Sequence, residues 1–377
     1  MTAIEFARDV YAGRVVFGAG SRRRVAEEAD RAGAARILVI ASTAEELLAD
    51  ELSHVLGDRV VGRFSDVVQH VPMAKAQDAR AMARDTAADA VLTVGGGSAT
   101  GLGKAIALEV DVIQIAVPTT YAGSEMTPIW GLTDGDHKLT GNDARVKPGV
   151  VIYDPELTLS LPPSIAGPSG MNALAHCVEA LYGPGADPVT SVLALEGVRA
   201  IATSLPRVCS TPDDLDARAT TLFGAHLAGV SLATGGTALH HKTCHVLGGM
   251  FNLDHGSMNA VVLGHALAYN APAIPEIMAR LAAVLDVDDA AAAMFDLAAA
   301  IGAPTDLASI GMPADGLDEA ARRIVVEAAG NVRPPDVDGI RTMLDDAFRG
   351  RRPTAPGSPE TGDSDTGTAD IGDSDTA

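Results

Sequence analysis

The chain has 377 residues and a formal net charge of -21; 47% of its residues are hydrophobic and only 3% are aromatic. This length allows two domains with cores of aliphatic side chains. The negative charge excludes nucleic-acid binding through a basic face, and an anionic substrate would need a local cationic pocket.

The sequence carries no recognisable targeting or membrane signal. Its first residues lack the charged start and long apolar run of a signal peptide, and no run reaches the ~20 apolar residues that span a bilayer. Cys177, Cys209 and Cys244 are an odd number without a CxxC pair, which is typical of a reduced protein. We therefore predict a cytoplasmic protein that contacts no membrane. Cys177 and Cys244 stand beside His176 and His245, so they are ligand or nucleophile candidates, although apolar packing is the favoured role.

The first half alternates apolar runs with helical stretches. This pattern predicts a parallel sheet with covering helices, hence an α/β domain over residues 1–158. The expected strands are residues 15–20, 36–42, 59–64, 90–94, 112–118 and 150–155.

A glycine-rich run, GGGSATGLGKAIAL, follows the strand at 90–94. Gly95, Gly96 and Gly97 let the backbone approach a ligand closely. Ser98 and the free N–H groups of a helix starting near Thr100 would bind an anion. The run matches neither GxGxxG nor a P-loop, so it indicates a phosphate, with a tight strand-to-helix turn as the structural alternative.

A second polar loop, PTTYAGSEMTP, follows the strand at 112–118. Ligands bind at the carboxyl ends of strands in open α/β sheets, so two such loops favour a dinucleotide, with Thr119 and Thr120 as contacts. After the strand ending at Ala41 come Ser42 and Thr43, without the acidic residue that would exclude a 2′-phosphate. We therefore expect both NADH and NADPH to be used.

Basic residues gather in the polar, turn-rich segment that follows. Lys138, Arg145 and Lys147 could neutralise a carboxylate substrate or be solvated surface charges. Lys138 is our first choice for contacts with substrate and cofactor.

From Leu161 onward the periodicity becomes helical and predicts seven or more helices, an all-α domain over residues 159–350. Residues 351–377 contain two GDSDT repeats and little to bury, which predicts a disordered acidic tail.

Histidines concentrate in HHKTCHVLGGMFNLDH. His241 and His245 are four residues apart on one helix face, and Gly248 and Gly249 would let the chain break before His255 returns. Imidazole suits proton transfer or metal binding, so we expect a reactive centre here that faces the glycine-rich run between the domains.

A matching pair, Asn172 and His176, has the same spacing in GMNALAHCVEAL. These motifs, with GGGSATGLGKAIAL, PTTYAGSEMTPIWG and VVIYDPELTLSLP in this order, resemble the maleylacetate reductases, a branch of the iron-containing alcohol dehydrogenase superfamily. The resemblance runs from about Tyr11 to Arg349. It implies a dinucleotide-binding α/β domain followed by an all-α domain (the dehydroquinate synthase-like fold), a homodimer, and NADH- or NADPH-dependent reduction of the maleylacetate C=C bond to 3-oxoadipate in aromatic-compound degradation.

In metal-dependent members of the superfamily an Asp and three His hold the ion. These ligand positions fall here on Asn172, His176, His241 and His255. With the carboxylate missing, we expect a vestigial site and turnover that needs no metal. His245 is then the candidate general acid and the other three histidines are candidate hydrogen-bond donors to an enolate.

The candidate residues form three groups. Catalytic candidates are His245, His241, His176 and His255; substrate candidates are Lys138, Asn172 and Tyr121; cofactor candidates are Ser42, Gly95, Gly96, Gly97, Ser98, Thr119, Thr120 and Lys138. The alternatives are a metal-dependent alcohol dehydrogenase of the same superfamily and a catalytically silent nucleotide-binding protein whose tail recruits partners.

Overall fold

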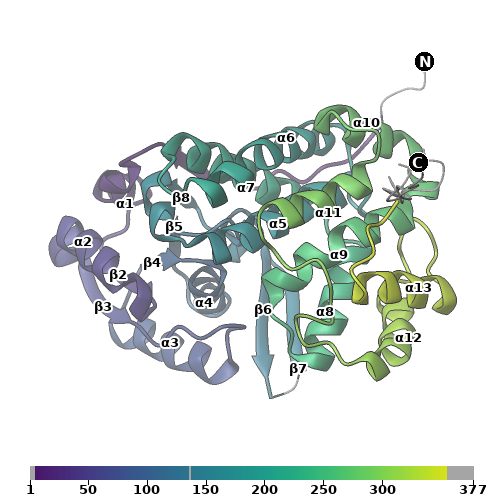
Figure 1. The fold of residues 1–377 in the computed structure, drawn as a ribbon. Helices are drawn as coiled ribbons and strands as arrows, with labels where there is room; N and C mark the ends of the chain where they lie inside the picture. Colours follow the sequence, from purple (N-terminus) through teal and green to yellow (C-terminus); the bar gives the residue numbers. More distant parts are fainter. Residues whose placement is uncertain (1–4, 136, 355–377) are drawn as a thin grey trace, which may run out of the picture.

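A six-stranded parallel sheet organises the first half of the chain (Figure 1). The computed structural model describes residues 5–135 and 137–354. The strand order is β1-β8-β5-β4-β2-β3, and every pairing is parallel. The strands are β1 (Arg14–Phe17), β2 (Ile37–Ala41), β3 (Val60–Phe64), β4 (Ala90–Gly95), β5 (Ile113–Pro118) and β8 (Val150–Tyr153). This confirms the predicted α/β architecture.

Helices cover both faces of the sheet, so its central strands are apolar throughout. In β2, Ile37 and Val39 face one core while Leu38 and Ile40 face another, as the two-residue period of a strand requires. The first core includes residues of α1 (Val25–Ala32) and α2 (Glu46–Leu56), and the second includes residues of α3 (Met73–Asp85) and α4 (Gly97–Ala107).

The segment predicted to be turn-rich is instead an antiparallel hairpin. It consists of β6 (Ile129–Asp134) and β7 (His137–Asn142) and lies between the sheet and the later helices (Figure 1). The strand pattern is hidden in the sequence because β7 is mostly exposed, so it has no apolar alternation. Gly141 faces Trp130, and a Cβ at this position would lie 2.5 Å from the indole.

The second half is helical, which confirms the predicted all-α part. Nine α-helices lie within the described residues: α5 (Pro163–Ala180), α6 (Pro188–Ser210), α7 (Leu215–Gly235), α8 (Leu239–Phe251), α9 (His255–Asn270), α10 (Pro275–Leu285), α11 (Ala290–Ala300), α12 (Leu317–Glu327) and α13 (Val337–Phe348). Ala116, Val151 and Tyr153 of the sheet share a core with α5, α6 and α7, so the halves pack together. The domain boundary at residue 158 stays a prediction.

The chain does not break at the glycines of the histidine stretch. Helix α8 continues through Gly248 and Gly249 to Phe251, and Asn252, whose φ of 52° is left-handed, caps its C-terminus. Asparagine tolerates this conformation better than most residues, so it can end a helix as glycine does. The predicted return of His255 therefore depends on Asn252.

Among the described residues, no single helix is long and apolar enough to cross a bilayer; α7 and α8 pass such a test only as a pair, which is bent by 95°.

Residues 355–377 of the predicted acidic tail lie outside the described part of the chain. Its first residues are packed, because Arg352 pairs with Asp296 at 2.7 Å and Pro353 is buried.

Candidate active site

The carboxyl ends of β2, β4 and β5 meet at one edge of the sheet. The chain leaves β2 towards β3 on one side and β4 towards β5 on the other, so the strand order reverses between β2 and β4. Ligands of open α/β sheets bind at such a reversal. The structure places Ser42, Gly95 and Thr119 at this edge. We call Ser42, residues 95–98 and residues 119–120 the nucleotide edge.

The glycine-rich run turns directly into α4. Gly95 has a φ of 137°, which favours glycine, and Gly96 precedes the helix, which begins at Gly97 rather than near Thr100. A Cβ on Gly96 would lie 2.9 Å from Thr120 Cγ2, so the two loops touch only because residue 96 has no side chain. The first N–H groups of α4 and the half-buried Ser98 lie at this turn, and a helix N-terminus attracts anions.

A buried lysine, which the sequence analysis missed, fixes this geometry. Lys104 of α4 is fully buried, and its Nζ donates to Ser124 O at 2.6 Å, Ile129 O at 2.7 Å and Thr127 Oγ1 at 3.0 Å. It therefore joins the helix of the glycine run to the segment after β5. Burial lowers the pKa of Lys104 to about 7.

A cavity of about 270 Å³ lies beside Ser42 and Thr43, and Arg63 of β3 also lines it. No acidic residue was expected at the end of β2, yet the Glu45 carboxylate turns back to accept a hydrogen bond from Ser42 Oγ. It also lies 3.5 Å from Thr119 Oγ1 and would be 3.5 Å from a Cβ on Gly95. Glu45 is thus a further candidate for contact with a nucleotide.

The predicted histidines do come together. His176 of α5 and His241 of α8 stack with ring centroids 4.6 Å apart and planes 13° apart. His245 follows one turn later on α8, and His255 is the first residue of α9. All four interact electrostatically, since the charges of the other three each act on His176. We call these four residues the histidine cluster.

The surroundings keep the cluster neutral. Desolvation is the largest cause that lowers the pKa of His176 and of His241, and both are buried. Desolvation also lowers the pKa of His245 and of His255, with Lys138 as the next contributor in each case. The side chain of His245 is itself exposed to solvent, although the protein around it is dense enough to lower its pKa.

The hairpin brings a cation to this cluster. Lys138 of β7 acts on His245, on His255 and on His70, whose pKa is lowered mainly by desolvation. Desolvation by the surrounding protein lowers the pKa of Lys138, although its side chain is exposed. The sequence analysis gave His70 no role; only the hairpin places it here.

The other two predicted cations point elsewhere. Arg145 pairs with Asp143 at 2.6 Å, and Lys147 donates to the backbone oxygens of Ala12 and Pro148.

Tyr121 is not placed to contact a substrate. Its side chain is fully buried in the core beside Thr158 and Arg218. Its backbone N–H donates to Ser169 Oγ of α5 at 3.1 Å, one turn before Asn172. Tyr121 therefore links the nucleotide edge to the helix that carries part of the cluster.

Three buried polar atoms at this site lack a hydrogen-bond partner, which raises the question of a ligand. Asn172 Oδ1, His176 Nδ1 and His241 Nε2 find no hydrogen-bond partner among the described residues. Native proteins pair nearly all buried polar groups, and an exception requires an explanation such as an ion. Amide oxygen and neutral imidazole nitrogen are suitable ligands for a divalent transition metal.

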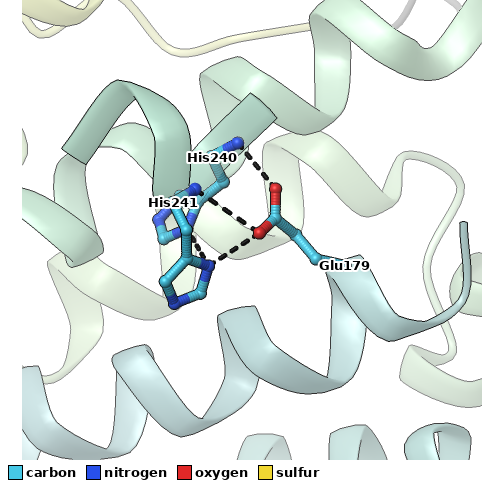
Figure 2. A group of neighbouring side chains, drawn as sticks. All are labelled: Glu179, His240 and His241. Carbon is cyan, nitrogen blue, oxygen red and sulfur yellow. Dashed lines mark hydrogen bonds and ion pairs between the residues drawn. The ribbon is translucent and has the colours of Figure 1, made fainter. Parts of the chain in front are cut away.

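Two further residues, Glu179 and His240, contact His241, and the sequence analysis assigned no role to either. The fully buried Glu179 of α5 accepts from His240 N at 2.6 Å and lies 2.7 Å from His241 Nδ1 (Figure 2). Burial raises the pKa of Glu179 and lowers that of His241, so the contact is a hydrogen bond to a neutral imidazole rather than an ion pair. A glutamate in the apolar run HCVEALY was the available signal, because a buried carboxylate needs a partner.

Comparison with known proteins defines the class. Residues 12–155 match the family model of iron-containing alcohol dehydrogenases, and residues 167–348 match the model of the C-terminal part of the same family. The chain belongs to the iron-containing alcohol dehydrogenase family.

The particular relatives are maleylacetate reductases. The chain is 46% identical to "Maleylacetate reductase" of Sphingobium indicum, over 93% of this chain and 99% of that protein. It is 47% identical to the Burkholderia cepacia protein of the same name, over 90% of this chain and 97% of the other. The crystal structure of maleylacetate reductase from Agrobacterium tumefaciens superposes with a TM-score of 0.90, with 44% identity, 93% of this chain and 100% of that chain covered.

The expectation that no metal is required is wrong. Both family models describe iron-containing enzymes. The structure also gathers three side chains of metal-ligating type, Glu179, His240 and His241, whose nitrogen and oxygen atoms lie within 4.8 Å of one another. The unpartnered atoms of Asn172, His176 and His241 fit such a group as well. Replacement of one carboxylate ligand by Asn172 is therefore not sufficient reason to discount a metal.

Proposed function

We propose that this oxidoreductase reduces the C=C bond of maleylacetate with NADH or NADPH and produces 3-oxoadipate. The observation that carries the proposal is the identity of 46–47% to proteins named maleylacetate reductase over at least nine tenths of the chain. The position of Lys138 beside the histidine cluster supports it, because a dianion must enter a protein of charge -21.

Residues of the nucleotide edge, the hairpin and the histidine cluster have different roles in this proposal. The N-terminus of α4 and Ser98 bind the pyrophosphate, and Ser42 with Thr119 and Thr120 lines its path. Lys138 and His70 bind a substrate carboxylate. When bound, the nicotinamide supplies the hydride, and a divalent ion held by Asn172, His176, His241 and His255 would polarise the substrate carbonyl.

Hydride addition at the carbon conjugated with the ketone leaves an enolate, which hydrogen-bond donors stabilise. His245 donates the proton that completes the saturated product. Its pKa is lowered in the protein alone, but a bound dianion would raise this pKa towards neutrality because negative charge favours imidazolium.

The remaining expectations extend the proposal. We propose a cytoplasmic homodimer that acts in aromatic-compound degradation. A dimer is supported by β1, an edge strand whose Val15 and Phe17 are exposed, and by exposed Phe6 and Val10 just before it. An unpaired apolar edge invites pairing with a second copy.

Steady-state NADH and NADPH oxidation with maleylacetate prepared in situ tests the function. We expect maleylacetate to be preferred over simple aldehydes by orders of magnitude in kcat/KM. Faster turnover of an alcohol or aldehyde would instead support an alcohol dehydrogenase.

The substrate cation is tested with Lys138→Ala. Loss of a charge-assisted contact, worth about 1.5–3 kcal/mol, should raise KM for maleylacetate roughly 10- to 150-fold with kcat less affected. Arg145→Ala is the matched control, because it removes a neighbouring cation that already pairs with Asp143. An unchanged KM in Lys138→Ala would remove this residue from the site.

A further inference from the structure

The Glu179 carboxylate makes two different contacts at once. Helix α8 begins after Ala238, whose methyl group cannot accept a hydrogen bond, and the Glu179 carboxylate from α5 accepts from the N–H of His240 instead. Its second oxygen, Oε2, lies 2.7 Å from His241 Nδ1 and 3.4 Å from His241 N. One carboxylate thus caps a helix and contacts an imidazole (Figure 2).

The distances identify hydrogen bonds rather than shared metal ligation. Two atoms bound to one tetrahedral zinc-like ion at ~2.1 Å lie about 3.4 Å apart. The separation of Glu179 Oε2 and His241 Nδ1 is 2.7 Å, and that of His240 Nδ1 and His241 Nδ1 is 3.2 Å. The first is too short for two ligands of the same ion and ordinary for N–H···O. An ion at this group would also displace the cap of α8.

The neighbouring contacts determine where the protons lie. His240 Nε2 lies 3.0 Å from the carbonyl oxygen of Asn259, which can only accept, so Nε2 carries the proton. In a neutral His240 ring, Nδ1 is then an acceptor. It faces His241 Nδ1, which must be the donor. Glu179 Oε2 accepts from the backbone N–H of His241 at 3.4 Å, and it accepts the Nδ1 proton of the same residue as well. The single Nδ1 proton is shared between these two acceptors, and both contacts give the same tautomer of His241.

We propose that Glu179 and His240 are positioning residues that hold His241 with its proton on Nδ1, so that the bare Nε2 lone pair is presented to a divalent cation. Nε2 is the atom of His241 that is buried and unpartnered among the described residues. A carboxylate behind a ligating imidazole fixes its tautomer and orientation and increases its basicity. His241 is then an acceptor towards the site, not a hydrogen-bond donor to an enolate. The consequence for metal binding rests on the ligands proposed above; the tautomer does not.

The decisive measurement is the nitrogen NMR spectrum of histidine-labelled, metal-stripped protein, with the His241 signals assigned by their loss in His241→Asn. We expect a protonated Nδ1 and a bare Nε2 in the wild type. A proton on Nε2 of His241 would overturn the proposal, and this result needs no variant at Glu179.

Glu179→Gln separates positioning from capping. The glutamine oxygen can still accept from His240 N, while its amide would donate to His241 Nδ1 and force the proton to Nε2. We expect this change of tautomer and a loss of about 10- to 100-fold in Zn²⁺ affinity, measured by competition with a chromophoric chelator in the absence of nucleotide.

Glu125→Gln is the matched control. Glu125 is also buried at 2% exposure, and it bonds Tyr153 Oη at 2.6 Å rather than a histidine. Its replacement should change neither the tautomer nor the affinity. Wild-type Zn²⁺ affinity in a folded Glu179→Gln protein, or an equal loss in Glu125→Gln, would contradict the proposal. Neither readout uses maleylacetate, so a wrong substrate would leave this test intact.

Discussion

At the nucleotide edge a buried cation is surrounded by acceptors, whereas in the histidine cluster buried polar atoms lack partners. Lys104 donates to three residues of the adjoining segment, so the helix that follows Gly96 is held in place by the protein alone. Asn172 Oδ1 and His241 Nε2, by contrast, are unpartnered among the described residues. The first region is organised before any ligand binds, and the second has bonding capacity that only a ligand would use. Pre-organisation of the nucleotide edge should therefore be separable by mutation from ligand binding at the cluster.

The largest effect is expected from Lys104→Met. The substitution keeps the volume but leaves the carbonyl oxygens of Ser124 and Ile129 without their buried donor. Each buried acceptor left without its donor costs roughly 1–3 kcal/mol, so we expect a loss of about 2–6 kcal/mol of unfolding free energy. Urea unfolding followed by circular dichroism measures this loss.

Lys75→Met is the control for Lys104→Met. Lys75 is also a helical lysine, but its ion pair with Asp66 is at the surface, where such pairs contribute ~0–1 kcal/mol. A Lys104 variant no less stable than the Lys75 variant would show that the cation does not hold the nucleotide edge.

Gly96→Ala should weaken nucleotide binding without affecting metal binding. The new Cβ would meet Thr120 at 2.9–3.0 Å, so the Thr120 side chain or its loop must shift where the pyrophosphate is proposed to bind. We expect a rise of at least about tenfold in the Kd for NADH, or ~1.4 kcal/mol, with Zn²⁺ affinity unchanged. Fluorescence titration with NADH and chelator competition give the two values.

Gly330→Ala supplies the comparison, because a Cβ there meets nothing within 4 Å. If Gly96→Ala lowered both affinities together, the two regions would not be the separate units that their hydrogen bonding indicates.

The sequence correctly predicted features that depend on a short stretch of neighbouring residues. Continuous apolar runs predicted β2, β4 and β5, and the i, i+4 spacing predicted that His241 and His245 share a helix face. The glycine-rich run predicted a strand-to-helix turn, although α4 begins at Gly97 rather than near Thr100. Nothing local, however, distinguishes β7, because its strand is exposed and its pairing is set by β6.

Two of the residues that were missed, Glu179 and Lys104, act through long-range contacts. Glu179 meets His241 across 62 positions, and Lys104 reaches Ile129 across 25. Asn252, not Gly248, ends α8, because the backbone conformation rather than residue type alone decides where a helix stops. Buried charges in apolar helices were the signal available, since each must be paired in the folded protein.

The smallest effect concerns Glu45, which was overlooked because its side chain turns back over the end of β2. Its carboxylate bonds Ser42 Oγ and lies beside Gly95 and Thr119, so it adds a negative charge to the nucleotide edge. A carboxylate can accept from a ribose hydroxyl but repels a 2′-phosphate. We therefore expect Glu45→Gln to shift the ratio of kcat/KM towards NADPH by about tenfold, or ~1.4 kcal/mol. Asp58→Asn, which neutralises an exposed carboxylate outside the site, should leave the ratio unchanged. A ratio that moves less than twofold in Glu45→Gln would mean that this charge does not discriminate between the two nucleotides, and Arg63, which lines the same cavity, would become the residue to replace next.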